Sequence, residues 1–139
     1  MINYNLIYDR IAIINKAVNR LENMRSFTLS EFLQNTDYFA IAEHNLRIAL
    51  EGVFDIGRHI LVKSGMGKPE DYKQILVMLG QNKVIPFDFA EKIKGMAGYR
   101  NRLVHLYNEV DGEELYDIFK NKLEDTKEYV VHILNYLNS

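Results

Sequence analysis

Residues 39–62 read FAIAEHNLRIALEGVFDIGRHILV, and this stretch decides the fold. Its apolar residues recur at steps of three and four, the spacing that places side chains along one face of an α-helix. The members of this face are Phe39, Ala42, Leu46, Ala49, Val53, Ile56 and Ile60. Asn35 and Thr36 can cap the start of the helix, and Ser64 with Gly65 marks its end. We therefore expect a long helix at the centre of a helical bundle.

Two glycines, Gly52 and Gly57, lie inside this predicted helix. Glycine within a helix costs about 1 kcal/mol relative to alanine, so its presence at two positions needs a reason. Because glycine has no side chain, it allows a neighbouring helix to come close. We expect both glycines to serve close helix packing rather than flexibility.

The chain before the central helix predicts one long and one short helix. From Tyr4 onward, apolar residues again recur at steps of three and four. They are Ile7, Ile11, Ile14, Val18 and Leu21. Thr28 followed by Glu31 has the form of a capping box, and it predicts a short helix that continues through Leu33.

Two prolines open the helices predicted after the central one. Pro69 at a first helical position starts a third helix that runs to Leu79 and is stopped by Gly80. Pro86 repeats this arrangement and starts a fourth helix, which runs towards Gly98. The side chains expected to face inward on the fourth helix are Phe87, Phe89, Ile93, Met96 and Ala97.

A last long helix is predicted near the carboxyl end. Asp111 with Glu114 is a capping-type opening. The apolar residues that follow are Leu115, Phe119, Leu123, Val130, Ile133 and Leu137. No strand pattern interrupts this series, so we predict an all-α fold, a bundle of four long helices with one or two short ones, forming a single domain over residues 1–139.

Composition narrows the classes of function. The chain has 139 residues, 47% of them hydrophobic, and no cysteine, which excludes a disulfide framework, a thiol nucleophile and a Cys-ligated metal site. No export signal is visible, and no run approaches the roughly 18 apolar residues that a membrane span needs. We expect a cytoplasmic protein without a membrane partner. Because the net charge is −2, any contact with RNA must rely on a local basic patch.

The chemically richest stretch is Gly98–Tyr107, which holds two arginines, an amide, an imidazole and a phenol. On a straight helix Asn101 and His105 share a face, whereas Arg100 and His105 lie roughly 140° apart. Both can then act on one group only at a helix end, at a kink, or across a subunit interface. The nearby glycines, Gly95 and Gly98, are compatible with a kink.

The sequence lacks the motifs of several common metal and phosphate sites. A di-iron carboxylate site needs Glu three residues before His, and here those positions hold Ile41, Ile56, Arg102 and Tyr129. No His-Glu-x-x-His zinc motif and no phosphate-binding loop are present, so we expect no metal site. Asp55 and His59 lie one turn apart on the central helix. They are either an ordinary helix pair or side chains that orient the Gly98–Tyr107 stretch from a neighbouring helix.

The order Arg100, four residues, His105, one residue, Tyr107 resembles the R-x-x-x-x-H-x-Y signature of HepT-like toxins of the HEPN superfamily, and Asn101 fits the common R-N start. The resemblance extends over essentially the whole chain. It implies a helical, metal-independent endoribonuclease without a cofactor, acting as a homodimer on RNA or tRNA. It also implies a nucleotidyltransferase antitoxin partner that modifies Tyr107 with AMP.

The residues suit RNA cleavage by transphosphorylation, in which the 2′-hydroxyl attacks the adjacent phosphorus. His105 can act as base or acid because imidazole titrates near neutral pH. Arg100 can brace the phosphoryl oxygens, and Asn101 can hold the imidazole or the ribose. The main alternative is a HEPN-type module that binds nucleotide or protein without cutting. A purely structural oligomerisation domain would explain the core but not the motif.

Overall fold

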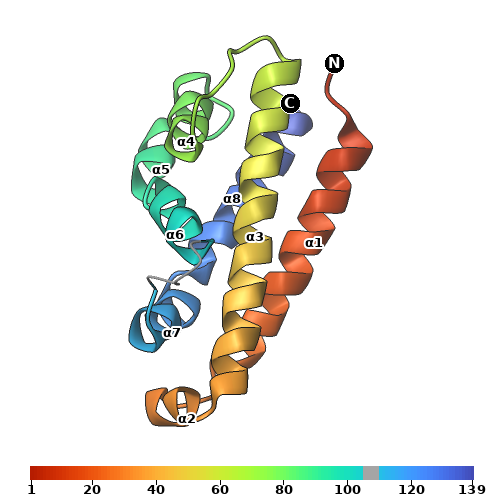
Figure 1. The fold of residues 1–139 in the computed structure, drawn as a ribbon. Coiled ribbons are helices and arrows are strands. Elements are labelled where there is room, and N and C mark those ends of the chain that lie inside the picture. The colour runs from red at the N-terminus through yellow and green to blue at the C-terminus, as the bar shows by residue number, and fades with distance from the viewer. Residues whose placement is uncertain (105–109) are drawn as a thin grey trace.

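The structure, a computed structural model, describes residues 1–104 and 110–139, and all regular structure within these ranges is helical. The all-α prediction is therefore confirmed. α3 (Thr36–Lys63) is the longest described helix and lies at the centre of the molecule (Figure 1). Its start and end agree with the prediction, since Oδ1 of Asn35 accepts a hydrogen bond from the N–H of Asp37 and Ser64 is the C-cap. None of the described helices is both long and apolar enough to cross a membrane.

α1 (Tyr4–Asn23) lies alongside α3, and its predicted apolar face is buried (Figure 1). The two helices pack closely at Gly52, where an added Cβ would lie 2.5 Å from Cγ1 of Ile14. At Gly57 an added Cβ would lie 2.6 Å from Cγ2 of Ile75 on α4 (Tyr72–Gln81). Both glycines therefore permit close helix approach, as the sequence predicted.

The amino terminus is attached to the end of α3. The N–H of Asn3 donates a hydrogen bond of 2.9 Å to Nε2 of His59, and the terminal amine of Met1 donates to the carbonyl of Lys63. Burial, together with the positive charges of Lys63 and the amino terminus, lowers the pKa of His59 below its usual value of 6.5. His59 is therefore neutral at pH 7, and its ring nitrogen can accept the hydrogen bond.

The remaining helices close the core around α3. α8 (Leu123–Leu137) passes behind α3 in the view of Figure 1, and the buried Tyr129 hydroxyl donates a hydrogen bond of 2.8 Å to the carbonyl of Val53. Burial raises the pKa of Tyr129, so the phenol stays protonated. α2 (Leu29–Gln34) begins at the predicted capping box and packs against α7 (Gly112–Asn121) at the end of the bundle far from the chain termini (Figure 1).

The predicted bounds of the third helix are wrong at both ends. α4 begins at Tyr72 rather than Pro69, because the carboxylate of Asp71 accepts a hydrogen bond of 2.8 Å from the N–H of Gln74 and caps the helix there. Gly80 lies inside α4 and does not stop it. An added Cβ at Gly80 would lie 2.6 Å from Cβ of Ala90, so this glycine is required by close packing against the next helix.

The predicted fourth helix is two helices. α5 (Phe87–Ile93) follows Pro86, and α6 (Met96–Leu103) starts after a break at Lys94 and Gly95. The break agrees with the kink considered near the two glycines, but it falls at Gly95, whereas Gly98 is helical. Phe87 does not face inward: it is 61% exposed, because it is the first residue of α5 and precedes the turn that packs on the core.

The predicted last helix is also two helices, α7 and α8. Asp111 caps α7 as expected, with its carboxylate accepting a hydrogen bond from the N–H of Glu114. The chain then breaks at Lys122, whose backbone leaves the helical region with φ −121°. The apolar spacing continues across this break because Phe119 and Leu123 are both buried, so periodicity alone could not place it.

The close contacts at Gly52 and Gly57 can be tested by substitution. Gly52→Ala and Gly57→Ala should each lower the free energy of unfolding by about 1–3 kcal/mol, because the added methyl group forces packed neighbours to move. Gly98→Ala is the matched control, since an added Cβ there meets no atom within 4 Å. It should leave stability unchanged or raise it by up to about 1 kcal/mol. Equal stability of all three variants in denaturant titrations would contradict the packing argument.

Candidate active site

α6 places Arg100 against α3 and α4. Nη2 of Arg100 lies 3.2 Å from Oε1 of Glu51 on α3. The guanidinium carbon lies 4.1 Å from the centre of the Tyr72 ring, at the start of α4. The side chain of Arg100 is only 17% exposed. Arg100 is therefore a partly buried cation held in one place by an ion pair and by an aromatic face.

Tyr72 is itself fixed from two sides. Its ring meets the ring of Phe54 edge to face, with the centroids 5.0 Å apart. Its backbone begins α4 directly after the Asp71 cap. Phe54 of α3 and the Asp71 cap of α4 thus fix the position of the Tyr72 ring under Arg100. The guanidinium therefore has little freedom to turn away.

Arg47 attaches the end of α6 to α3. It lies one turn before Glu51 on α3, and its Nη2 donates to the carbonyl of Leu103, the last residue of α6, at 3.3 Å. The same nitrogen lies 2.8 Å from Oε1 of Glu43. A cation at the last carbonyls of a helix satisfies groups that have no partner within the helix.

Arg102 attaches α6 to α7. Both of its terminal nitrogens donate to the two carboxylate oxygens of Glu114, in the parallel arrangement that arginine and carboxylate favour. α6 precedes and α7 follows residues 105–109, which lie outside the described ranges. The two helices that flank these residues are therefore connected to each other by a charge-assisted pair.

The structure places part of the predicted catalytic set. Arg100 and Asn101 lie on α6, where Arg100 is partly buried and Asn101 is exposed. His105 and Tyr107 fall among residues 105–109, outside the described residues. The arrangement of His105 relative to Arg100 and Asn101 therefore stays a prediction.

Asp55 and His59 contact the amino-terminal part of the chain. The carboxylate of Asp55 lies 3.3 Å from Nε of Arg10 on α1, and His59 accepts the hydrogen bond from Asn3. Among the described residues, the carboxylate of α3 that holds Arg100 is that of Glu51. The idea that Asp55 and His59 orient the motif thus receives no support for Arg100, and for His105 it stays a prediction.

Sequence reasoning missed Glu51, Tyr72 and Arg47. Glu51 lies one turn before Asp55 on the same helix, so the i, i+4 spacing of Asp55 and His59, extended backwards, would have reached it. Arg47 lies at the same spacing, one turn earlier. Tyr72 gave no signal, because its role depends on how α4 packs beside α3.

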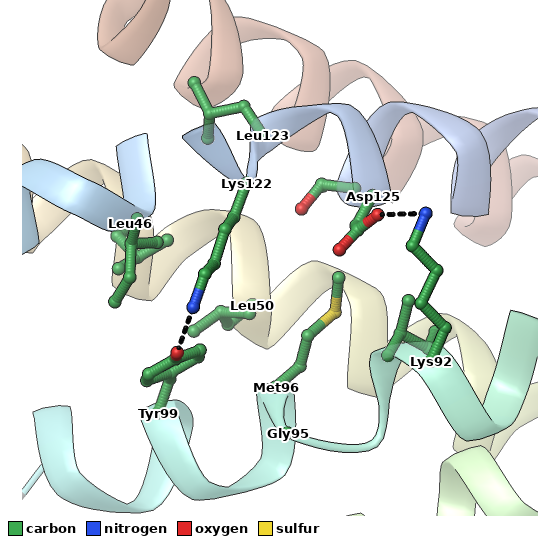
Figure 2. A pocket seen from close by; sticks show the side chains of 12 residues that line it. Leu46, Leu50, Lys92, Gly95, Met96, Tyr99, Lys122, Leu123 and Asp125 are labelled. Carbon is green, nitrogen blue, oxygen red and sulfur yellow. Dashed lines mark hydrogen bonds and ion pairs between the residues drawn. The ribbon is translucent and has the colours of Figure 1, made fainter. Parts of the chain in front are cut away.

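A separate pocket of about 230 Å³ lies on another side of α6 (Figure 2). Its walls are mostly apolar, and Tyr99 and the three charged side chains that line it form two pairs. Nζ of Lys122 donates a hydrogen bond of 2.8 Å to the Tyr99 hydroxyl, which together with Asp117 raises the pKa of Lys122. Nζ of Lys92 lies 3.2 Å from Oδ1 of Asp125. Neither Arg100 nor Asn101 lines this pocket, which is therefore separate from the described part of the candidate active site.

Comparison with known proteins gives consistent matches. A family model described as Ribonuclease HepT-like matches residues 14–133. The tRNA nuclease HepT of Aphanizomenon flos-aquae is 27% identical over 132 residues, covering 95% of this chain and 90% of that protein. The mRNA nuclease HepT of Shewanella oneidensis is 26% identical over 126 residues, covering 91% of this chain and 94% of that protein. The solved structure of a tri-AMPylated Shewanella oneidensis HEPN toxin in complex with an MNT antitoxin matches with a TM-score of 0.83 at 26% identity, covering 94% of this chain and 97% of that chain.

These matches cover both the helices and the motif. The family match begins within α1 and ends within α8, so it includes Arg100, Asn101, His105 and Tyr107. The similarity of the solved toxin spans nearly the whole chain, in agreement with the predicted resemblance. The chain belongs to the ribonuclease HepT-like family.

Proposed function

We propose that this protein is the endoribonuclease toxin of a toxin-antitoxin pair and that it cleaves RNA by attack of a 2′-hydroxyl on the adjacent phosphorus. The observation that carries the proposal is Arg100, a cation fixed against Glu51 and Tyr72 at the start of the R-x-x-x-x-H-x-Y motif. The names of the relatives, a tRNA nuclease and an mRNA nuclease, support RNA as the substrate.

The motif offers a residue for one proton transfer, one for charge stabilisation and one for orientation. The 2′-oxygen forms a bond to phosphorus while the bond from phosphorus to the 5′-oxygen of the next nucleotide breaks. A proton leaves the 2′-hydroxyl and a proton reaches the 5′-oxygen, and His105 serves one of these transfers. Arg100 stabilises the charge that develops on the phosphoryl oxygens, and Asn101 orients the imidazole or the ribose. The products are a 2′,3′-cyclic phosphate and a 5′-hydroxyl.

In this scheme the guanidinium supplies the cation, the imidazole serves one proton transfer, and solvent water serves the other. None of these steps needs a metal ion, so we expect cleavage to continue in EDTA. Arg100→Ala and His105→Ala should each lower the cleavage rate by about 10²–10⁴-fold, the range typical for loss of a general acid or base or of a preorganised charge.

The measurement is cleavage of total tRNA and of mRNA, with end-group analysis and thermal melts of every variant. Arg20→Ala is the control, because it removes one exposed arginine of α1 far from the motif in sequence. Cleavage that persists at the wild-type rate in both motif variants would contradict the assignment. If a variant loses both its activity and its melting transition, the loss of activity would be assigned to unfolding. In that case Arg100→Lys, which keeps the positive charge, tests the role of Arg100 in stabilising the phosphoryl oxygens.

We infer that the active form is a homodimer in which two motifs share one cleft. The side chain of Arg100 is directed at α3 and α4 of its own subunit, and α6 ends at Leu103, so the geometry of this helix does not itself bring His105 to Arg100. A second subunit can supply the missing group, and two-fold symmetry brings the same surface of each subunit together.

Complementation tests this arrangement. Arg100→Ala and His105→Ala subunits, each inactive alone, should regain roughly a quarter of wild-type activity after mixing and exchange, because heterodimers form half of the dimers and carry one intact site of two. Sedimentation should show a dimer. Absence of complementation by heterodimers verified by mass would contradict the shared site, and an active monomer would contradict the dimer.

We further propose that a nucleotidyltransferase antitoxin adds AMP to Tyr107. The solved relative is described as a tri-AMPylated HEPN toxin in complex with an MNT antitoxin, which supports this partner class. AMP on Tyr107, seven residues after Arg100 in the motif, would add a negative phosphate that can compete with RNA for the guanidinium and a bulky base that can block the cleft.

The modification is tested by incubation with the cognate nucleotidyltransferase and ATP, followed by intact mass measurement and peptide mapping. The wild-type protein should gain AMP on Tyr107 and lose cleavage, with an unchanged melting temperature. Tyr107→Phe should gain none and keep its activity. Equal modification and inhibition of the Phe variant would exclude Tyr107 as the modified residue.

A further inference from the structure

Arg58 is an exposed arginine close to Arg100. It lies on α3, and its guanidinium carbon is 5.6 Å from the centre of the Tyr72 ring. The same ring lies under Arg100 at 4.1 Å. Arg100, the proposed catalytic cation, and Arg58, which lies outside the motif, therefore both contact the ring of Tyr72.

Arg58 continues a row of arginines along α3. Residues 47, 51 and 58 fall within about 40° of one another on a helix of 100° per residue, so Arg47, Glu51 and Arg58 share one face. At 1.5 Å per residue, Arg47 and Arg58 are separated by about 16 Å along the axis. Arg100 joins this face between them through its ion pair with Glu51.

The other arginines of this region are already neutralised. Arg47 pairs with Glu43, Arg100 with Glu51, and Arg10 with Asp55. No carboxylate lies within ion-pair distance of Arg58 in the part of the chain that the structure describes. Because an unpaired surface guanidinium keeps its donors for an external anion, Arg58 is the cation of the row best suited to a ligand.

The surface next to Arg58 is concave and carries positive charge. A groove of about 360 Å³ between α1 and α3 is lined by Arg10, Arg58 and Lys63, with His59 among them. Its one carboxylate, that of Asp55, is paired with Arg10. The net charge of the whole chain is −2, so this local excess of cations is a specific feature of the groove.

We propose that Arg58 binds an RNA phosphate next to the scissile one, and that the groove beside it carries the strand away from the active site. The proposal rests on the proposed ribonuclease function. A nucleic-acid strand presents phosphates at regular intervals, and cations in a row on a concave surface follow such a backbone. RNA is favoured over an acidic protein surface because Arg58 lies over the same ring as Arg100, which is assigned to the reacting phosphate.

The test uses a single-stranded RNA oligonucleotide with every 2′-hydroxyl methylated, which binds but cannot be cleaved. Its affinity is measured by fluorescence anisotropy over a range of salt concentrations for the wild-type protein and three variants. Arg58→Gln should bind about tenfold more weakly at low salt, and the slope of log K against log salt should fall by about 0.7, the value for one phosphate contact on a single strand. Arg58→Lys should keep most of the salt dependence, because the charge remains.

Arg20→Gln is the matched control, since it removes the same charge from the exposed surface of α1 outside the groove. It should change neither affinity nor slope as much as Arg58→Gln does. With natural RNA, Arg58→Gln should raise KM roughly tenfold and change kcat much less, because Arg58 contacts a phosphate that does not react. Thermal melts of all variants should coincide, as Arg58 is exposed.

An unchanged affinity and an unchanged salt slope for Arg58→Gln would overturn the proposal. An equal effect of Arg20→Gln would also overturn it. If Arg58→Gln weakened only the binding of the nucleotidyltransferase antitoxin, the groove would be assigned to that protein instead. A wild-type protein that binds the methylated RNA but cleaves no natural RNA would remove the ribonuclease function, whereas the role of Arg58 would still be decided by the binding data.

Discussion

The ion pair between Arg100 and Glu51, stacked on Tyr72, is the interaction on which the candidate site depends. It joins residues 49 positions apart and brings α6 against α3 and α4 at once. Because the side chain of Arg100 is only 17% exposed, its charge has lost part of its contact with water. The fixed carboxylate of Glu51 offsets part of that loss. In the structure this carboxylate is paired with the guanidinium of Arg100, so in the proposed mechanism an RNA phosphate competes with Glu51. Under that proposal, Glu51 positions Arg100 and also limits how strongly Arg100 binds an anion.

α3 makes this arrangement possible because it is packed on several sides. α1 approaches at Gly52 and α4 at Gly57, and the carbonyl of Val53 receives the Tyr129 hydroxyl from α8. The remaining polar face of α3 carries Arg47 and Arg58, and Arg100 joins it through Glu51. Such a rigid support is what a preorganised charge needs, since a guanidinium that had to reorient during the reaction would lose much of its effect. α6 is short, but its end is attached to α3 through Arg47.

The sequence predicted those parts of the fold that local chemistry controls. The caps at Thr28, Asn35 and Asp111 start helices where expected, because each side chain accepts a hydrogen bond from the first turn. The break at Gly95 agrees with the kink expected near Gly95 and Gly98, but the break at Lys122 could not be placed, since apolar spacing continues through it. For the site, the motif and its resemblance to HepT-like toxins point to Arg100 and Asn101, whose catalytic roles stay a prediction. Glu51 and Tyr72 could not be assigned, because their contacts with Arg100 are long-range and depend on helix packing.

The central claim, that Arg100 is the cation that meets the substrate phosphate and that Glu51 competes for it, is tested most directly by a double-mutant cycle. The dissociation constant of uncleavable 2′-O-methyl RNA is measured for wild type, Glu51→Gln, Arg100→Gln and the double variant. Glu51→Gln should bind RNA several-fold more tightly in the wild-type background, because the competing carboxylate is gone, and should have a much smaller effect when Arg100 is absent. An effect of Glu51→Gln that is the same in both backgrounds would contradict the account.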